Sequence, residues 1–141
     1  MREILFKAKV KTKVIKVDIW VEGSYFFQPL VDEHFIVDRK GETYSIDINT
    51  LCQFTGLTDK NGNKIWENDI IGFLDTSCYD NGYAEYYCTG KVFWDEETLS
   101  FQVTERISCE SYEALDGDCE VIGNKFDNAE LLERGVEDWK D

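Results

Sequence analysis

The sequence predicts a mainly β fold: a small barrel-like core of short antiparallel strands, an N-terminal β-hairpin region and a C-terminal helix. Two observations lead to this prediction. Many short stretches alternate apolar and polar residues with a period of two, as half-buried strands do. Turn-forming residues separate these stretches at short intervals, which is typical of barrels and small sheets. We expect the barrel-like core over about residues 50–125.

The length of 141 residues favours a single domain over residues 1–141. Within it we expect an N-terminal β region of about residues 1–50, and a β core with the C-terminal helix over about residues 51–135. A chain of this size buries about 68–70% of its unfolded surface. It therefore needs neither a disulfide nor a metal ion to fold.

The first strand is expected at residues 6–14, where every second residue is a lysine. The period of two places four lysines on one face: Lys7, Lys9, Lys11 and Lys13. The alternation then slips by one residue, so we expect a bulge or turn near Val14-Ile15. This lysine strand is the best candidate for contact with an anion or a partner, because basic strands beside aromatic residues can hold single-stranded nucleic acid. The alternatives are that the lysines protect an exposed edge from pairing, or that they pair with acidic residues of the same chain.

Two hairpins are expected in the middle of the chain. Residues 34–38 and 42–47 flank a turn in which Gly41 can adopt a positive φ. Residues 58–63 form a second tight turn, because Asn61-Gly62 is the strongest short hairpin signal in the sequence. Further strands are expected at residues 64–66, 70–74, 83–94, 99–103 and 119–122, with a loop at residues 75–82.

The one helix is expected at residues 128–134. Asp127 or Asn128 can cap its N-terminus, and Gly135 follows its end. The hydrophobic core is expected to include five residues of the central block: Ile65, Trp66, Ile70, Ile71 and Phe73.

The formal net charge of −14 is carried by the second part of the chain. Residues 1–50 contain eight basic and eight acidic residues, whereas residues 51–141 contain seven and twenty-one. Such an acidic surface either imitates a polyphosphate and acts as a decoy for a host DNA-binding protein, or is a solvated, self-repelling surface. Its sign disfavours wrapping nucleic acid over most of the protein.

The cysteines indicate a reducing compartment, so we expect the host cytoplasm. Their odd number and the lack of a C-x-x-C pair fit neither a disulfide framework nor a zinc site. The five thiols, which we expect to be free, are those of Cys52, Cys78, Cys88, Cys109 and Cys119. No signal peptide is recognisable, and no apolar run approaches the roughly 20 residues of a membrane span, so no contact with a membrane is expected.

No motif for catalysis, metal binding or cofactor binding is found in the sequence. The stretch from Asp59 to Asn63 begins like a calcium loop, but the positions that need Gly and Glu are Lys64 and Ile70. His34 is the only histidine, and no nucleophile motif accompanies it. We therefore expect a protein that is not an enzyme and that binds no metal or cofactor.

Three motifs in this sequence resemble the YopX family of phage and prophage proteins. They are the opening M-R-E-I-L-F-K, the central Q-F-T-G-L-T-D-K-N-G-N-K-I-W-E-N-D-I-I from residue 53, and the closing E-V-I-G-N-K-F-D-N-A-E-L-L from residue 120. Asn68 and Ala129 stand where the family usually has Gly and Pro, and Asn tolerates the left-handed conformation that such a turn needs. The structural turn residues of the central motif are expected to be Gly56, Asp59, Asn61, Gly62 and Asp69.

The resemblance implies a mainly β fold and a phage or prophage origin, with no established activity and no catalytic residues. Our leading hypothesis is a non-enzymatic accessory protein that binds a host or phage protein or self-assembles into a homo-oligomer. The alternatives are nucleic-acid binding through the lysine strand, and the acidic decoy.

Overall fold

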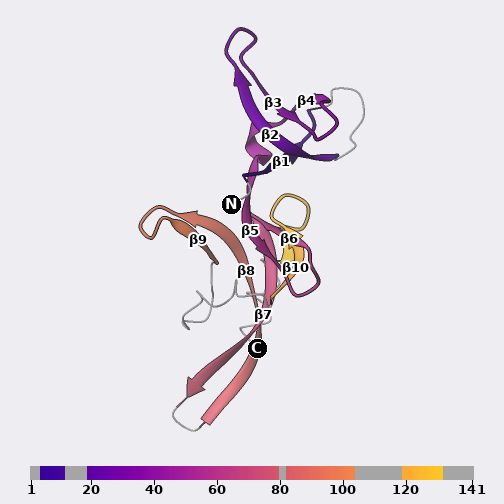
Figure 1. The fold of residues 1–141 in the computed structure, drawn as a ribbon. Helices are drawn as coiled ribbons and strands as arrows, with labels where there is room; N and C mark the ends of the chain where they lie inside the picture. Colours follow the sequence, from indigo (N-terminus) through magenta and orange to yellow (C-terminus); the bar gives the residue numbers. More distant parts are fainter. Residues whose placement is uncertain (1–3, 12–18, 80–81, 104–118, 132–141) are drawn as a thin grey trace. The chain divides into compact units, whose positions relative to one another are not determined.

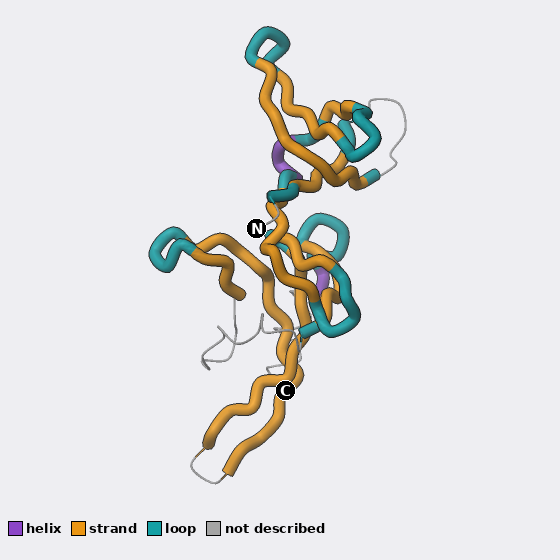
Figure 2. Tube along the Cα trace, viewed as in Figure 1, coloured by secondary structure: helices purple, strands orange, loops and turns teal. Residues whose placement is uncertain are grey.

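The computed structural model describes residues 4–11, 19–79, 82–103 and 119–131 of the chain. The described strands form two antiparallel sheets (Figures 1 and 2). The chain divides into two compact units, residues 1–56 and 57–141. That the whole chain acts as one domain stays a prediction.

The first unit is built from hairpins that follow one another along the chain. Its elements are β1 (Phe6–Lys9), β2 (Trp20–Gln28), β3 (Glu33–Val37), β4 (Thr43–Ser45), the short 3-10 helix η1 (Ile48–Thr50) and β5 (Cys52–Thr58). The strand order of this sheet is β4-β3-β2-β1-β5-β6, with β5 continuing across the boundary between the units. An isolated bridge also pairs Val10 with Ile46, just after β4.

The core of the first unit lies on one face of β1. Ala8 is fully buried together with Ile36 and Ile46, and partly buried apolar side chains surround them: Phe6, Val21, Tyr25 and Leu51. The neighbouring lysines of β1 are only partly buried, as the period of two predicts. The strand ends at Lys9, so the predicted strand over residues 6–14 is too long at Lys11, and residues 12–14 lie outside the described part of the chain. A Cβ at Gly23 of β2 would lie 1.9 Å from the carbonyl oxygen of Val37, so only glycine permits this approach of β2 and β3.

The second unit contains the other sheet, which has fewer but longer strands, in the order β10-β7-β8-β9. The strands of this sheet are β7 (Asp69–Tyr79), β8 (Gly82–Asp95), β9 (Ser100–Val103) and β10 (Glu120–Asn124). The second unit also contains β6 (Lys64–Trp66), which belongs to the first sheet. The five core residues expected from the central block are all buried, which confirms that prediction. Three of them, Ile65, Ile71 and Phe73, form one core cluster with three other buried residues, Val92, Val103 and Cys119.

The predicted barrel is wrong, because neither described sheet closes on itself. Closure needs the two outer strands to pair, and β9 and β10 remain at opposite ends of the second sheet's strand order. The predicted loop at residues 75–82 is also wrong over most of its length. Here β7 continues to Tyr79 and stays paired with β8, as far as the pair Tyr79–Gly82. The backbone ladder therefore overrides the polar, turn-like composition of this stretch.

The predicted C-terminal helix is not supported. Among the described residues of the predicted helix, 128–131, only Glu130 and Leu131 have α-helical backbone, and residues 132–134 lie outside the described part of the chain. The side chain of Asn128, which we expected to cap the helix, is turned back toward β10, where its Oδ1 accepts a hydrogen bond from the Asn124 N–H at 3.2 Å. The bulge expected near Val14-Ile15 also lies outside the described residues.

Candidate functional site

The lysine strand is held around a single tryptophan. In the register of β1 and β2, Lys9 faces Trp20 and Lys7 faces Glu22. The Nζ atoms of Lys7 and Lys9 lie 4.7 and 5.5 Å from the centroid of the Trp20 ring. Lys11 follows as an exposed residue, and Lys13 lies outside the described residues.

Two ammonium groups over one indole ring form a small cationic platform on the sheet. Each such contact contributes about 0.5–1 kcal/mol at an exposed site, so the Trp20 ring helps to position the two ammonium groups. Both lysines are partly buried. Their charges face the same partly exposed ring, which is an arrangement that can attract an anion. The structure thus brings together the first two of the four predicted lysines.

The turn between β5 and β6 is organised by the carboxylate of Asp59. Its Oδ1 accepts hydrogen bonds from the N–H groups of Asn61 at 2.9 Å and Asn63 at 2.8 Å. Its Oδ2 accepts the N–H of Val121 at 2.9 Å, and the side-chain amide of Asn63 at 3.3 Å. The side chain is 5% exposed. Burial opposes ionisation and is the largest single influence, but the hydrogen bonds from Val121, Asn63 and Asn61 together outweigh it and lower the pKa of Asp59.

The turn also joins the central motif to the closing motif of the sequence. Lys60 donates its N–H to the carbonyl of Cys119 at 3.0 Å, next to the bond between Asp59 and Val121. Both bonds bring the turn onto the start of β10. Asp59 therefore acts as a structural acceptor here, with both carboxylate oxygens occupied by donors.

The remaining motif residues hold further turns. Gly56 and Gly62 have φ values of 89° and 83°, in the left-handed region that favours glycine. Asn68 is also left-handed, with φ 71°, and Asn is tolerated there. The buried Asp69 accepts the N–H of Trp66 through Oδ2 at 2.8 Å. These geometries give the named residues of the central motif a structural role in its turns.

The closing motif is explained in the same way. Oδ1 of Asn124 accepts the N–H groups of Phe126 and Asp127, both at 2.9 Å, and so closes the turn after β10. A Cβ at Gly123 would lie 2.5 Å from Oδ1 of Asn128, so a larger residue there would displace the Asn128 side chain.

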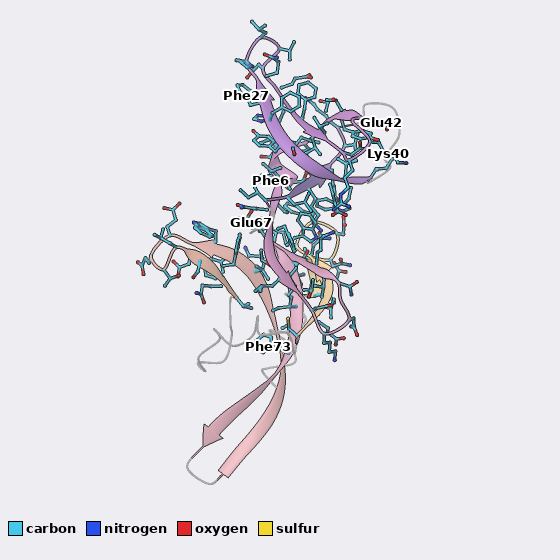
Figure 3. All side chains as sticks on the ribbon, in the orientation of Figure 1. Phe6, Phe27, Lys40, Glu42, Glu67 and Phe73 are labelled. Carbon is cyan, nitrogen blue, oxygen red and sulfur yellow. The ribbon has the colours of Figure 1, made fainter. Side chains whose placement is uncertain are left out.

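A surface that the sequence did not single out lies at the β2–β3 hairpin. Four of its apolar side chains are exposed: Phe26 (38%), Phe27 (44%), Leu30 (91%) and Val31 (57%). Figure 3 shows Phe27 on this hairpin, close to its turn. The signal available in the sequence was the run Tyr25-Phe26-Phe27 followed by Pro29, which predicts a turn after an apolar strand.

The two buried cysteines that the structure describes, Cys52 and Cys119, form no disulfide. The side chains of Cys78, Cys88 and Cys109 lie outside the described set. Over the described ranges, no group of three or more His, Cys, Asp or Glu residues is placed to hold a metal ion. In the same part of the chain, no helix has the length and apolar character of a membrane span.

These features define a class of protein: a small, mainly β chain whose distinctive motifs build turns and whose β2–β3 hairpin exposes four apolar side chains. The model of the YopX protein family matches residues 7–133, which is most of the sequence. The chain therefore belongs to the YopX family. A search of curated proteins returned no match.

Proposed function

We propose that this chain is a phage or prophage accessory protein that acts in the host cytoplasm by binding another macromolecule, without catalysis. Its family membership suggests a phage-related role that is poorly defined. The observation that supports binding is the exposed apolar surface of the β2–β3 hairpin. Leu30 and Val31 are adjacent in its turn, at 91% and 57% exposure, and adjacent exposed apolar side chains can mark an interaction site.

The absence of catalysis in this proposal rests on residue chemistry. His34 is the only histidine, and its Nδ1 lies 2.6 Å from the Tyr25 hydroxyl. Its ring lies against the rings of Tyr25 and Phe27, with centroid distances of 5.8 and 4.8 Å. A histidine engaged with aromatic neighbours in this way is a structural residue of the hairpin.

An affinity pull-down from lysogenic or infected host cells tests the proposal. We expect the wild-type chain to retain a macromolecule that survives washing and rebinds when purified. Size-exclusion chromatography of the purified chain, compared with the monomer mass of 16.4 kDa, distinguishes a partner from self-assembly. A chain that retains nothing and elutes as a monomer would contradict the proposal.

A second candidate function is the binding of single-stranded nucleic acid by the cationic platform of Lys7, Lys9 and Trp20. Stacking of bases on an aromatic ring beside lysines is sequence-tolerant, and it weakens steeply with salt because counterions are released. Titration of an oligothymidine with the Trp20→Ala variant tests it, with Trp94→Ala as the matched control at a 38% exposed tryptophan. Equal affinities for the two variants would exclude this function.

A further inference from the structure

The exposed turn of the β2–β3 hairpin extends beyond its neighbouring strands. The register of β1 with β2 covers Trp20–Gly23 only, and that of β3 with β4 covers Phe35–Val37 only. The end of the hairpin around Gln28 and Glu33 therefore has its own two strands as its ladder partners. In Figures 1 and 2 its turn projects past the other strands of the first unit. Because Leu30 is 91% exposed at the end of this projecting hairpin, a pocket on another molecule could bind its side chain.

Ring contacts join the two strands of this hairpin below its turn. On one face, the rings of Phe26 and Phe35 stack across the strands with centroids 5.2 Å apart. On the other, the ring of Phe27 lies against His34, which is fixed by the Tyr25 hydroxyl. Cross-strand aromatic pairs stabilise an antiparallel ladder. Little conformational freedom is lost when such an element docks, so its apolar turn can contribute to affinity.

The charges of the hairpin define the partner. From Trp20 to Val37 the sequence contains Glu22, Asp32 and Glu33 and neither Lys nor Arg. Asp32 and Glu33 directly follow the exposed Leu30 and Val31. An anionic lipid surface or a nucleic acid would be repelled by this turn. The part of a second copy that carries its net charge of −14, residues 51–141, would also repel this turn.

We propose that the β2–β3 hairpin inserts Leu30 and Val31 into an apolar pocket on a partner protein whose rim carries Lys or Arg. This inference rests on the proposed function and names the chemistry of its partner. Apolar burial supplies the affinity, and the acidic residues of the turn steer the approach to the basic rim.

The first experiment places the photo-crosslinker benzoylphenylalanine at Leu30 in host cells and, as a matched control, at Leu99. Leu99 is 72% exposed and lies in the turn between β8 and β9. We expect a protein crosslinked from position 30 and not from position 99. Crosslinking from both positions alike, or only to another copy of this chain, would overturn the inference. Binding of the purified chain to vesicles of phosphatidylcholine and phosphatidylglycerol, lost in Leu30→Ser/Val31→Ser, would also overturn it.

The second experiment measures the affinity of the purified chain for the protein identified by crosslinking. We expect Leu30→Ser/Val31→Ser to weaken it by about ten-fold or more, and Leu99→Ser to leave it unchanged. Asp32→Asn/Glu33→Gln should slow association and flatten its dependence on salt. A partner bound equally by all variants would overturn the hairpin inference and leave the proposed function intact. If even the wild-type chain bound no specific partner, both the hairpin inference and the proposed function would be contradicted.

Discussion

The turn between β3 and β4 and the turn between β5 and β6 have the same local structure in different surroundings. In each, an aspartate accepts the N–H groups two and four residues ahead through Oδ1: Asp38 from Lys40 and Glu42, and Asp59 from Asn61 and Asn63. In each, a glycine three residues after the aspartate has positive φ: Gly41 (85°) and Gly62 (83°). Three-residue hairpin loops with glycine in this place are common.

The two turns differ in their contacts with the rest of the fold. Asp38 is partly exposed, and its Oδ2 lies 3.4 Å from the Tyr44 hydroxyl. The Tyr44 hydroxyl also donates to Glu42 at 2.6 Å, and this bond is the main reason why the pKa of Tyr44 rises to about 12. Asp59 is buried and accepts the N–H of Val121, 62 residues away in the sequence. The comparison separates what five residues can build locally from what a long-range contact adds.

The strongest test of this comparison replaces each aspartate by asparagine. An asparagine at residue 38 can keep its oxygen toward both backbone donors, whereas at residue 59 its NH₂ must face donors on one side. We expect Asp59→Asn to lower the free energy of unfolding by about 3 kcal/mol and Asp38→Asn by about 1 kcal/mol. Urea unfolding followed through amide resonances of each unit measures both. If both variants lost the same free energy of unfolding, the burial of Asp59 and its bond from Val121 would contribute nothing to stability.

Valine at each glycine tests the part that the two turns share. A Cβ at Gly41 or Gly62 would meet no atom within 4 Å, so the penalty comes from the backbone conformation alone. We expect Gly41→Val and Gly62→Val each to destabilise by about 1–3 kcal/mol. Asparagine at either position should have a smaller effect, because it tolerates positive φ. Losses that differ clearly between the two valine variants would refute the shared local structure.

Acid distinguishes the turns through the lowered pKa of Asp59. Above the unfolded value, about 3.9, the carboxylate is ionised in both states and its stabilisation is fully present. As the pH falls below about 4, the unfolded chain takes up the proton first, and the stabilisation is lost until the pH passes below the folded pKa. The difference in unfolding free energy between wild type and Asp59→Asn should therefore shrink between pH 5 and pH 2. If this difference in unfolding free energy did not change with pH over that range, the effect of Asp59→Asn would come from altered hydrogen-bond geometry and not from the lost charge.

Substitutions in the third turn, between β2 and β3, should have the smallest effect on stability. Leu30 and Val31 are exposed, so we expect Leu30→Ser/Val31→Ser to change the unfolding free energy by no more than about 0.5 kcal/mol. The same urea experiment measures it. A larger loss would mean that these side chains belong to the core of the first unit, and the docking role of the hairpin would lose its basis.

Local features of this fold were predictable from the sequence. Asn61-Gly62 and Gly41 marked two hairpins, and Ile65 and Trp66 marked the core of the second unit. Each depends on a few neighbouring residues, on a backbone preference or on a period of two. The family was predictable from the order and spacing of its motifs, and the match over residues 7–133 confirms it.

Sheet closure and the apolar hairpin were not predictable in this way. Pairings such as Phe6 with Gln53 and Glu120 with Gly72 join distant segments, and the alternation of a single strand does not encode its partner. The run Tyr25-Phe26-Phe27 resembles a core strand, and Tyr25 does pack against the core. The exposure of Phe26 and Phe27 depends on where β1 and β4 stop pairing, which the run itself does not encode. The aspartate of the central motif was expected at a turn, but its bond to Val121 needed the fold.

That bond has a consequence for the order in which the nascent chain acquires structure. The hairpins of the first unit lie within the first 56 residues, so they can form while the ribosome is still translating the remainder. The pairing of the β7 edge and the bond from Val121 to Asp59 must wait for β10, the last described strand. A ribosome that stalls before Cys119 would release a chain with an unpaired β7 edge, which is a template for aggregation.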